Sequence, residues 1–233
     1  MKQNLLKTML VMAGIVAGSM GAWADTVVLK PTQTTVIHGN DANDNTLESK
    51  VYYDVNATTW SCSYAKISGG AFTNEVKKWG GTPVVLTKFD ASSDLKGKNL
   101  KSATLTFTSQ CTVVGKNSNV QVAEVGTGWD ATTATWATVN TKEILYPVCL
   151  NGAGVNVNTT AKELTLDVTA ALLDNSDNTI GFAFYTATGR EQAISGITLT
   201  VESSDEAIKP ISYAVNLVDE NNKVLKSIFT TVQ

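Results

Sequence analysis

The sequence is poor in the side chains on which most catalytic centres depend. Its 233 residues include a single histidine, His38, and a single arginine, Arg190. Without a second histidine, a histidine-based metal site or a Ser-His-Asp triad is hard to build. Positive charge is scarce too, because 18 basic residues face 21 acidic ones. A chain without a basic excess is poorly suited to neutralise phosphates, which argues against nucleic acid as a partner.

Long hydrophobic runs are also missing. The apolar run at residues 10–17 is too short for a convincing membrane span. Two lysines precede this run, and Ala22-Trp23-Ala24 follows it, which is the pattern of a cleaved secretory signal; a retained anchor is the alternative. We therefore predict a signal peptide at 1–24 and a secreted chain (periplasmic, extracellular or cell-surface) with no membrane span after cleavage. That chain has 209 residues and, with 16 basic and 21 acidic ones, a net charge of −5.

Cysteine is sparse and odd in number. The three cysteines are Cys62, Cys111 and Cys149, and no Cys-x-x-Cys pair suggests zinc or redox chemistry. Export permits one disulfide and leaves one thiol over. Three pairings are open; we favour Cys111 with Cys149, because both follow strand-like runs.

Strand patterns dominate what is present. In residues 103–107 and 197–201, apolar residues alternate with threonine or another small residue, which is typical of strands with one buried face. Residues 180–184 place Ile180, Phe182 and Phe184 in another inward row. Turn signals rich in Gly, Asn, Asp and Ser separate these runs at short intervals. The fold class predicted is therefore all-β, a jelly-roll β-sandwich.

The sequence pattern divides the chain into three predicted parts. The signal peptide occupies 1–24, the sandwich 25–202, and a polar linker with a C-terminal β-hairpin 203–233. Within the sandwich, one helical turn is expected at 169–173, and residues 54–82 are expected to form a long loop or an inserted hairpin. A lone hairpin is marginal in water, so residues 203–233 are expected to pack on the sandwich or to dock a protein partner.

Aromatic residues on the irregular stretch are the candidate ligand contacts. Trp60, Tyr64 and Trp79 lie there, and aromatic faces can stack on sugar rings; packing within the loop is the alternative. Trp129 and Trp136 offer the same chemistry, but they belong to the stretches that carry the family resemblance described below, and this favours a structural role in the core.

One turn is rich in oxygen ligands. Asp41, Asn43, Asp44 and Asn45 could hold a structural calcium, which prefers six or more oxygens. The spacing lacks the bidentate glutamate of an EF-hand, so a solvated turn is the alternative.

Four stretches in one order resemble the DNRLRE-domain family, whose members include carbohydrate-binding modules found with alginate lyases and bacterial surface proteins. The similarity runs over about residues 27–202. Its pieces are the stretches 85–90 with 102–105, Trp129 with Thr135-Trp136, Asp167-Val168-Thr169, and Gly189-Arg190-Glu191 with 197–201. The resemblance implies a non-catalytic carbohydrate-binding module that recognises a polysaccharide or cell-surface glycan.

Two alternative roles are open for Arg190. Its position implies a structural ion pair with Glu191 at the end of a strand. Alternatively, its planar donor fork could clamp the carboxylate of a uronate.

Three functional classes remain open at this stage. The first is the non-catalytic glycan-binding module, for which we expect no enzyme activity. The second is a structural adhesin or assembly protein that uses its C-terminal hairpin. The third is a polysaccharide lyase or glycosidase, for which the carboxylates of Asp54, Asp130 and Asp167 are available but no local motif unites them.

Overall fold

The fold is known from a computed structural model that describes residues 24–73, 81–188, 190–205, 211–218 and 224–232, the last two ranges as backbone alone. All but the last residue of the predicted signal peptide lies outside this part. Within the described residues, no helix has the length and apolar character needed to cross a membrane.

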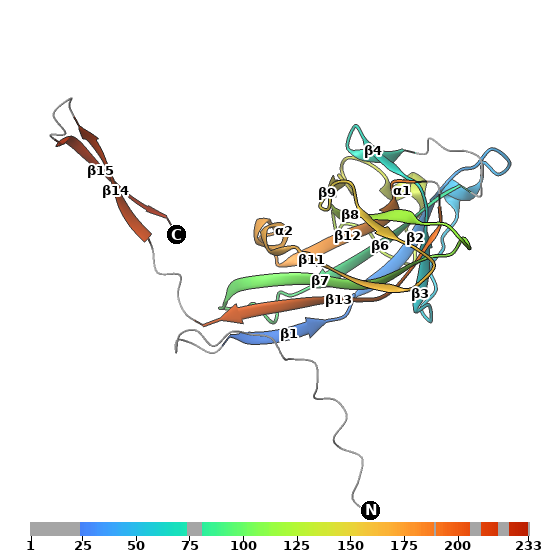
Figure 1. Ribbon diagram of the computed structural model, residues 1–233, viewed down its shortest axis with the longest axis horizontal. Helices are drawn as coiled ribbons and strands as arrows, with labels where there is room; N and C mark the ends of the chain where they lie inside the picture. Colours follow the sequence, from blue (N-terminus) through green and yellow to red (C-terminus); the bar gives the residue numbers. More distant parts are fainter. Residues whose placement is uncertain (1–23, 74–80, 189, 206–210, 219–223, 233) are drawn as a thin grey trace, which may run out of the picture.

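Two antiparallel sheets form a jelly-roll β-sandwich, as the sequence predicted (Figure 1). The five-stranded sheet contains β1 (Asp25–Leu29), β3 (Thr59–Cys62), β7 (Asn99–Cys111), β11 (Lys162–Asp167) and β13 (Gln192–Ser204). The six-stranded sheet contains β2 (Gln33–Gly39), β6 (Thr82–Asp90), β8 (Ser118–Val125), β9 (Val148–Cys149), β10 (Val155–Val157) and β12 (Thr179–Thr186). The chain crosses repeatedly from one sheet to the other, so neighbouring strands in a sheet are far apart in sequence.

The interior cluster fills the space between the two sheets. The inward rows predicted from alternation are confirmed, since Leu105 and Phe107 of β7 and Phe182 and Phe184 of β12 are almost fully buried there. Phe107 and Phe184 join the sheets through an edge-to-face contact with ring centroids 4.8 Å apart, a geometry that aromatic pairs prefer.

A second cluster covers the outer face of the six-stranded sheet. The residues opposite the inward rows, such as Leu86 and Ala183, are as deeply buried as the inward rows themselves. Their cover is the segment 126–147, which contributes Trp129 and Trp136, both less than a tenth exposed. Lys88 of β6 lies 4.9 Å from the centre of the Trp129 ring, a cation–π contact. The structural role predicted for these two tryptophans is confirmed.

The covering segment is fastened by hydrogen bonds that explain its sequence. Short helix α1 (Trp136–Val139) begins with a capping box, in which Thr135 and Thr138 each accept a hydrogen bond from the other's backbone nitrogen. The N–H of Gly126 donates to the carbonyl of Leu145 (2.8 Å), and the Trp129 indole donates to the carbonyl of Gly126 (3.0 Å).

The helical turn predicted at 169–173 is present as α2 (Thr169–Asp174). Asp167 Oδ1 accepts hydrogen bonds from the backbone N–H and the hydroxyl of Thr169 (2.9 and 2.6 Å). The backbone N–H of Ala103 donates to Thr169 Oγ1 (2.9 Å), which ties α2 to β7. The Asp-Val-Thr stretch therefore serves to start a helix and to anchor it.

The irregular stretch after residue 54 contains an inserted hairpin, β4 (Lys66–Ser68) with β5 (Ala71–Thr73), and a 3₁₀ turn, η1 (Leu47–Ser49), precedes it. Residues 143–149 contain only the short strand β9, because the chain there turns to cover the sheet. The C-terminal hairpin is formed by β14 (Ile211–Val218) and β15 (Val224–Val232), which pair with each other and with no other described strand.

We expect Gly126→Ala to lower the free energy of unfolding by about 2–4 kcal/mol, because a Cβ there would lie 2.0 Å from the carbonyl oxygen of Ile144. Gly128→Ala is the matched control, since a Cβ at Gly128 meets nothing within 4 Å. Urea unfolding of both variants measures the difference. Equal stability of the two would show that the covering segment does not depend on this close approach.

Candidate functional site

The candidate site lies where the edge of the five-stranded sheet is incomplete. Strands β1 and β3 pair with the same edge of β13, β1 opposite Leu199–Ser203 and β3 opposite Gln192–Ser195. A register irregularity between Ser195 and Thr198, with Gly196 at a φ of +60°, separates the two pairings. Among the described strands, none pairs with residues 196–198 on this side, so the edge is open there.

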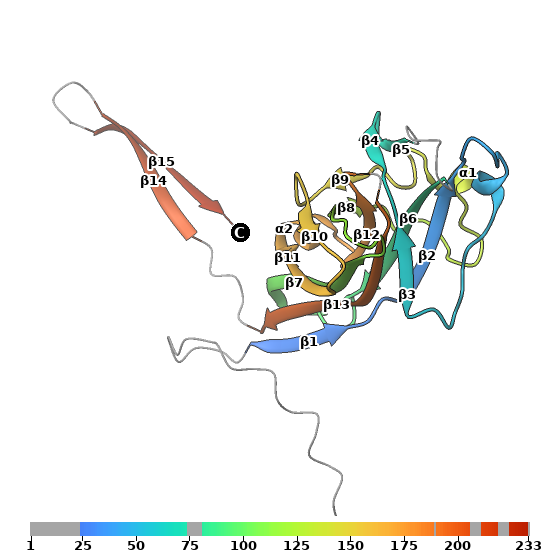
Figure 2. The same cartoon turned by 45° about the vertical axis from the view of Figure 1, so that its right-hand side comes forward.

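Strand β3 closes the side of the sandwich beyond this opening. After Cys62 the chain leaves β13, and the N–H of Ser63 donates to the carbonyl of Pro83 on β6 (2.9 Å). The carbonyl of Ser63 accepts from Thr186 of β12 (2.8 Å). Figure 2 shows β3 standing between β13 and β2, with β6 behind. Strand β3 therefore bridges the two sheets at the edge of the sandwich.

A hollow of about 670 Å³ lies along β3. We call it the Trp60 hollow, and it is lined by Val36, His38, Tyr52, Ala57, Thr59, Trp60, Ser61, Ser63, Pro83, Val113, Arg190 and Glu191. It thus joins two of the predicted ligand-binding residues, Trp60 and Arg190, which are 130 positions apart in the sequence. Concave surfaces with an aromatic wall and a few polar groups are typical of ligand sites.

Trp60 is held by the fold and still reaches the surface. It lies opposite Ile194 in the β3–β13 pairing and packs in part against the interior cluster. Cys62, two residues further along β3, is fully buried, whereas Trp60 is only half-buried, at the rim of the hollow. A ring fixed on one side and accessible on the other loses little freedom when a ligand stacks on it.

Arg190 is an exposed residue that lines the same hollow. The ion pairs found among the described residues are Lys50–Asp44 and Lys98–Asp25. The Arg190–Glu191 ion pair implied by the resemblance is therefore not formed in the structure. Both side chains line the hollow instead, where the guanidinium is available to a ligand.

His38 and Tyr52 complete the polar wall, and the sequence did not single them out as ligand contacts. Their ring centroids lie 5.0 Å apart. Burial lowers the pKa of His38 below its ordinary value, partly offset by a hydrogen bond with the Gly39 backbone and by the carboxylates of Asp41 and Glu191; nearby Lys50 lowers it further. Alternation along β2 places Val36 and His38 on one face, but nothing in the sequence shows that this face borders β3.

The other two predicted aromatic contacts lie elsewhere. Tyr64 bridges to Thr186 through the backbone and lines a separate hollow of about 350 Å³ with Cys149 and Tyr185. Trp79 lies outside the described residues. The structure thus brings together Trp60 and Arg190 and leaves Tyr64 apart from them.

The predicted Cys111–Cys149 disulfide is wrong, since all three cysteines are free in the structure. Cys111 ends β7 of the five-stranded sheet and is fully buried, whereas Cys149 belongs to β9 of the six-stranded sheet. Cys62 and Cys111 lie on opposite sides of Gln192 in β13, about two strand spacings apart, which is too far for a bond. Burial raises the pKa of the Cys62 thiol far above its usual range, so this thiol is unreactive.

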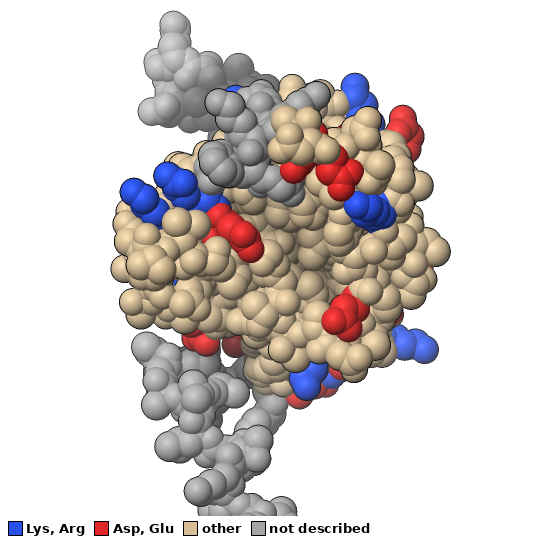
Figure 3. All heavy atoms as spheres, turned by 90° about the vertical axis from the view of Figure 1, so that its right-hand side faces the viewer, with Lys and Arg blue, Asp and Glu red and all other residues tan. Residues whose placement is uncertain are grey.

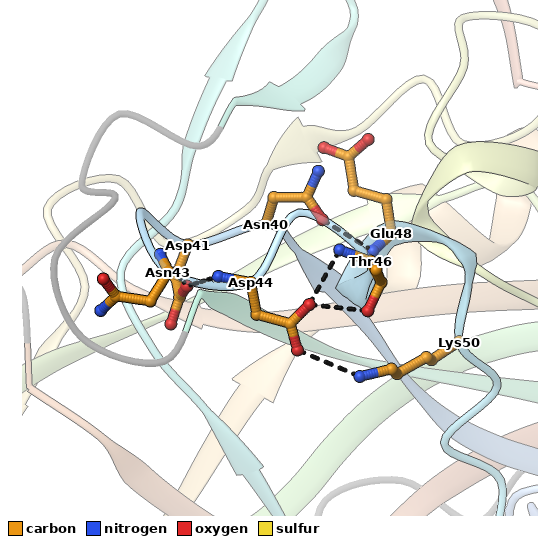
Figure 4. A network of polar contacts seen from close by, with 7 residues as sticks. All are labelled: Asn40, Asp41, Asn43, Asp44, Thr46, Glu48 and Lys50. Atoms are coloured by element: carbon orange, nitrogen blue, oxygen red, sulfur yellow. Dashed lines mark hydrogen bonds and ion pairs between the residues drawn. The ribbon is translucent and has the colours of Figure 1, made fainter.

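The oxygen-rich turn uses its carboxylates to hold its own loop (Figure 4). Asp41 Oδ1 accepts from the backbone nitrogens of Asn43 and Asp44 (2.7 and 2.5 Å). Asp44 accepts from Thr46 and pairs with Lys50 at 3.1 Å, and the hydrogen bonds from Thr46 hold its pKa at about 2. No cluster of three or more His, Cys, Asp or Glu side chains occurs in the described part of the chain. Calcium at Asp41, Asn43, Asp44 and Asn45 stays a prediction.

The carboxylates considered for catalysis already accept hydrogen bonds from neighbouring groups. Asp130 accepts from Thr132 and Gln33, Asp167 from Thr169, and Asp54 from the backbone N–H of Asn56. Hydrogen bonds from Thr132 and Thr169 lower the pKa of Asp130 and Asp167. A general acid of a glycosidase needs the opposite shift.

Comparison with solved structures returns carbohydrate-binding modules at low similarity. A CBM4 structure aligns at 10% identity over 63% of this chain and 90% of its own, with a TM-score of 0.33. The CBM22-1 xylan-binding domain of Paenibacillus barcinonensis Xyn10C aligns at 11% identity over 64% and 95%, with a TM-score of 0.30. The family 30 module of the Clostridium thermocellum cellulase Cel9D-Cel44B aligns at 12% identity over 65% and 95%, with a TM-score of 0.28.

No protein-family model and no curated protein matches the sequence. At TM-scores this low, the fold assignment depends on the strand topology of the chain itself.

We expect the free energy of unfolding to decrease as the pH is lowered, and to decrease less in the His38→Gln variant. Because the folded pKa of His38 is lowered, the unfolded chain binds a proton more readily as the pH drops through about 6.5, and protonation then favours unfolding. Urea unfolding at pH values between about 5 and 8 measures the effect. Carboxylates act equally in both proteins, so parallel pH profiles would contradict it.

Proposed function

We propose that this protein is a secreted, non-catalytic carbohydrate-binding module that holds a polysaccharide in the Trp60 hollow. The observation that carries the proposal is the meeting of Trp60 and Arg190 in one open hollow with Tyr52 and His38. An aromatic face stacks on the apolar side of a sugar ring, while the surrounding polar groups bind its hydroxyls. The predicted signal peptide and the resemblance to the DNRLRE-domain family support this proposal from the sequence side.

The surface around the site suits a carbohydrate. Figure 3 shows the face of the molecule at the right of Figure 1, on which acidic and basic side chains are interspersed with uncharged surface and form no large patch of one sign. Within the Trp60 hollow, one arginine is balanced by one glutamate. Such a surface offers hydrogen bonds without strong selection by charge.

Binding without chemistry is the mode that the side chains favour. The hollow contains one carboxylate, Glu191, whereas glycoside hydrolysis uses two carboxylates facing each other across the bond. A shallow open site also favours weak binding, on the order of micromolar to millimolar Kd.

We expect Trp60→Ala to weaken polysaccharide binding about tenfold or more, because the stacking surface is lost. Isothermal titration of the chain from Asp25 onward with mixed-linkage glucan, xylan, galactomannan and alginate measures it, with product analysis for cleavage. Trp60→Phe keeps a ring and should retain part of the affinity. Tyr146→Ala, at an exposed aromatic outside the hollow, is the matched control.

Binding that survives Trp60→Ala would move the site elsewhere, and the release of cleavage products would overturn the non-catalytic assignment.

Calcium enters the same experiment as a variable. If Asp41, Asn43, Asp44 and Asn45 hold a structural calcium, then adding a chelator lowers the thermal unfolding temperature.

A second function, protein assembly through the C-terminal hairpin, is favoured by one specific observation. Strand β14 has eight residues without charge or proline, and it pairs only with β15 among the described strands. Natural sheet edges are normally protected by charges, proline or short length, as β11 and β10 are here. An unprotected edge is suited to adding a strand from another protein.

Deleting residues 206–233 separates this function from glycan binding. We expect the shortened chain to keep its polysaccharide affinity, and any oligomer seen by light scattering to disappear. Val215→Lys, which places a charge in β14, should have the same effect on assembly. A monomeric full-length chain would argue against self-assembly through the hairpin.

A further inference from the structure

A second hollow follows the Trp60 hollow along the same strands. We call it the β13-gap hollow; it has a volume of about 450 Å³. Its lining comes from residues 30–34, from Tyr53, Asp54 and Val55 on the connection to β3, from Trp60, and from residues 196–198 of β13. Trp60 and Ala57 line both hollows.

The two hollows follow one another on each of the elements that line them. On β13 and the residues before it, the β13-gap hollow uses 196–198 and the Trp60 hollow uses 190–191. Along the β1–β2 region, the β13-gap hollow is lined by residues 30–34 and the Trp60 hollow by residues 36 and 38. Residues in a strand rise about 3.3 Å each, so the strand part of this lining, residues 33 to 38 of β2, covers roughly 17 Å. That length accommodates several linked sugar rings.

We propose that one elongated, unbranched stretch of polysaccharide occupies both hollows and crosses Trp60 between them. This inference deepens the proposed function and rests on it. It names the ligand as an internal segment of a linear polymer, bound along its length, and not a chain end or a single sugar.

The open edge of β13 adds backbone polar groups to the lining of the β13-gap hollow. Because β1 and β3 stop short of each other, residues 196–198 have no strand partner on that side among the described strands. Backbone donors and acceptors of an unpaired edge are available to ligand hydroxyls, which is a general property of sheet edges. The gap therefore supplies backbone hydrogen-bonding groups that the side-chain pattern of the sequence does not indicate.

Exposed apolar side chains border the same hollow. Tyr53 and Val55 are 38% and 74% exposed on the connection from β2 to β3. Tyr52, the neighbour of Tyr53, lines the Trp60 hollow instead. The connection thus contributes one aromatic residue to each hollow, with Trp60 between them.

The charges of the hollows do not favour a highly charged polymer. The β13-gap hollow contains Lys30 and Asp54, and the Trp60 hollow contains Arg190 and Glu191. Each has one cation and one anion, and the secreted chain is acidic overall. Shape and length of the ligand are therefore expected to decide affinity more than its charge.

The test is the dependence of affinity on ligand length. Titration of the chain from Asp25 onward with oligosaccharides from disaccharide to hexasaccharide, of the gluco, xylo, manno and uronate series, gives the profile. We expect affinity to rise at least tenfold between the shortest and longest member that bind. An affinity that is flat with length would overturn the two-hollow proposal and leave the Trp60 hollow as the site.

Variants on each side of Trp60 locate the added contacts. The double variant Tyr53→Ala, Val55→Ala alters exposed side chains of the β13-gap hollow, so its fold should be intact by circular dichroism. We expect it to weaken hexasaccharide binding about threefold to tenfold while disaccharide binding is unchanged. Tyr146→Ala is the control and should change neither.

The two proposals fail differently. An equal loss for short and long ligands in the double variant would contradict a separate second hollow. If no oligosaccharide or polysaccharide binds, the proposed function itself fails, and the two-hollow proposal fails with it.

Discussion

Burial of the six-stranded sheet on both faces is the constraint on which the rest of the structure depends. One face packs on the opposite sheet, and the other is covered by residues 126–147 with Trp129 and Trp136. A sheet in this position has no open face on which a long ligand could lie. The candidate site lies instead at the edge of the sandwich, where β13 lacks a partner over residues 196–198 and β3 bridges the two sheets.

The same constraint explains why the first three of the four stretches that resemble the DNRLRE-domain family are structural. Thr135 caps a helix that carries a buried tryptophan, and Asp167 starts a helix that Thr169 ties to β7. These residues hold the cover and the sandwich in place and do not line the Trp60 hollow. Resemblance at these positions therefore speaks for the fold, whereas the fourth stretch lines the proposed site with Arg190 and Glu191, together with the less regular residues 52–60.

The sequence predicted most of the fold because alternation is a local signal. Leu105 and Phe182 occupy the inward rows expected from period two, and a short helix begins at Thr169 as expected. The site was only partly predictable, because its residues meet through strand order. Nothing local places Arg190 beside Trp60, and the disulfide failed for the same reason, since strand-like flanks do not show that Cys111 and Cys149 belong to different sheets.

The position of Trp60 links stability to recognition. Its ring must pack in part against the interior cluster to be fixed, and must remain partly open to stack on a ligand. A fully buried tryptophan, such as Trp129, is rigid but unavailable; a fully exposed one would lose more conformational freedom on binding. The incomplete edge of β13 permits the intermediate state, because the gap beside β3 leaves one side of the ring uncovered. The opening in the sheet is thus both a small loss of backbone pairing and the feature on which the proposed binding surface depends.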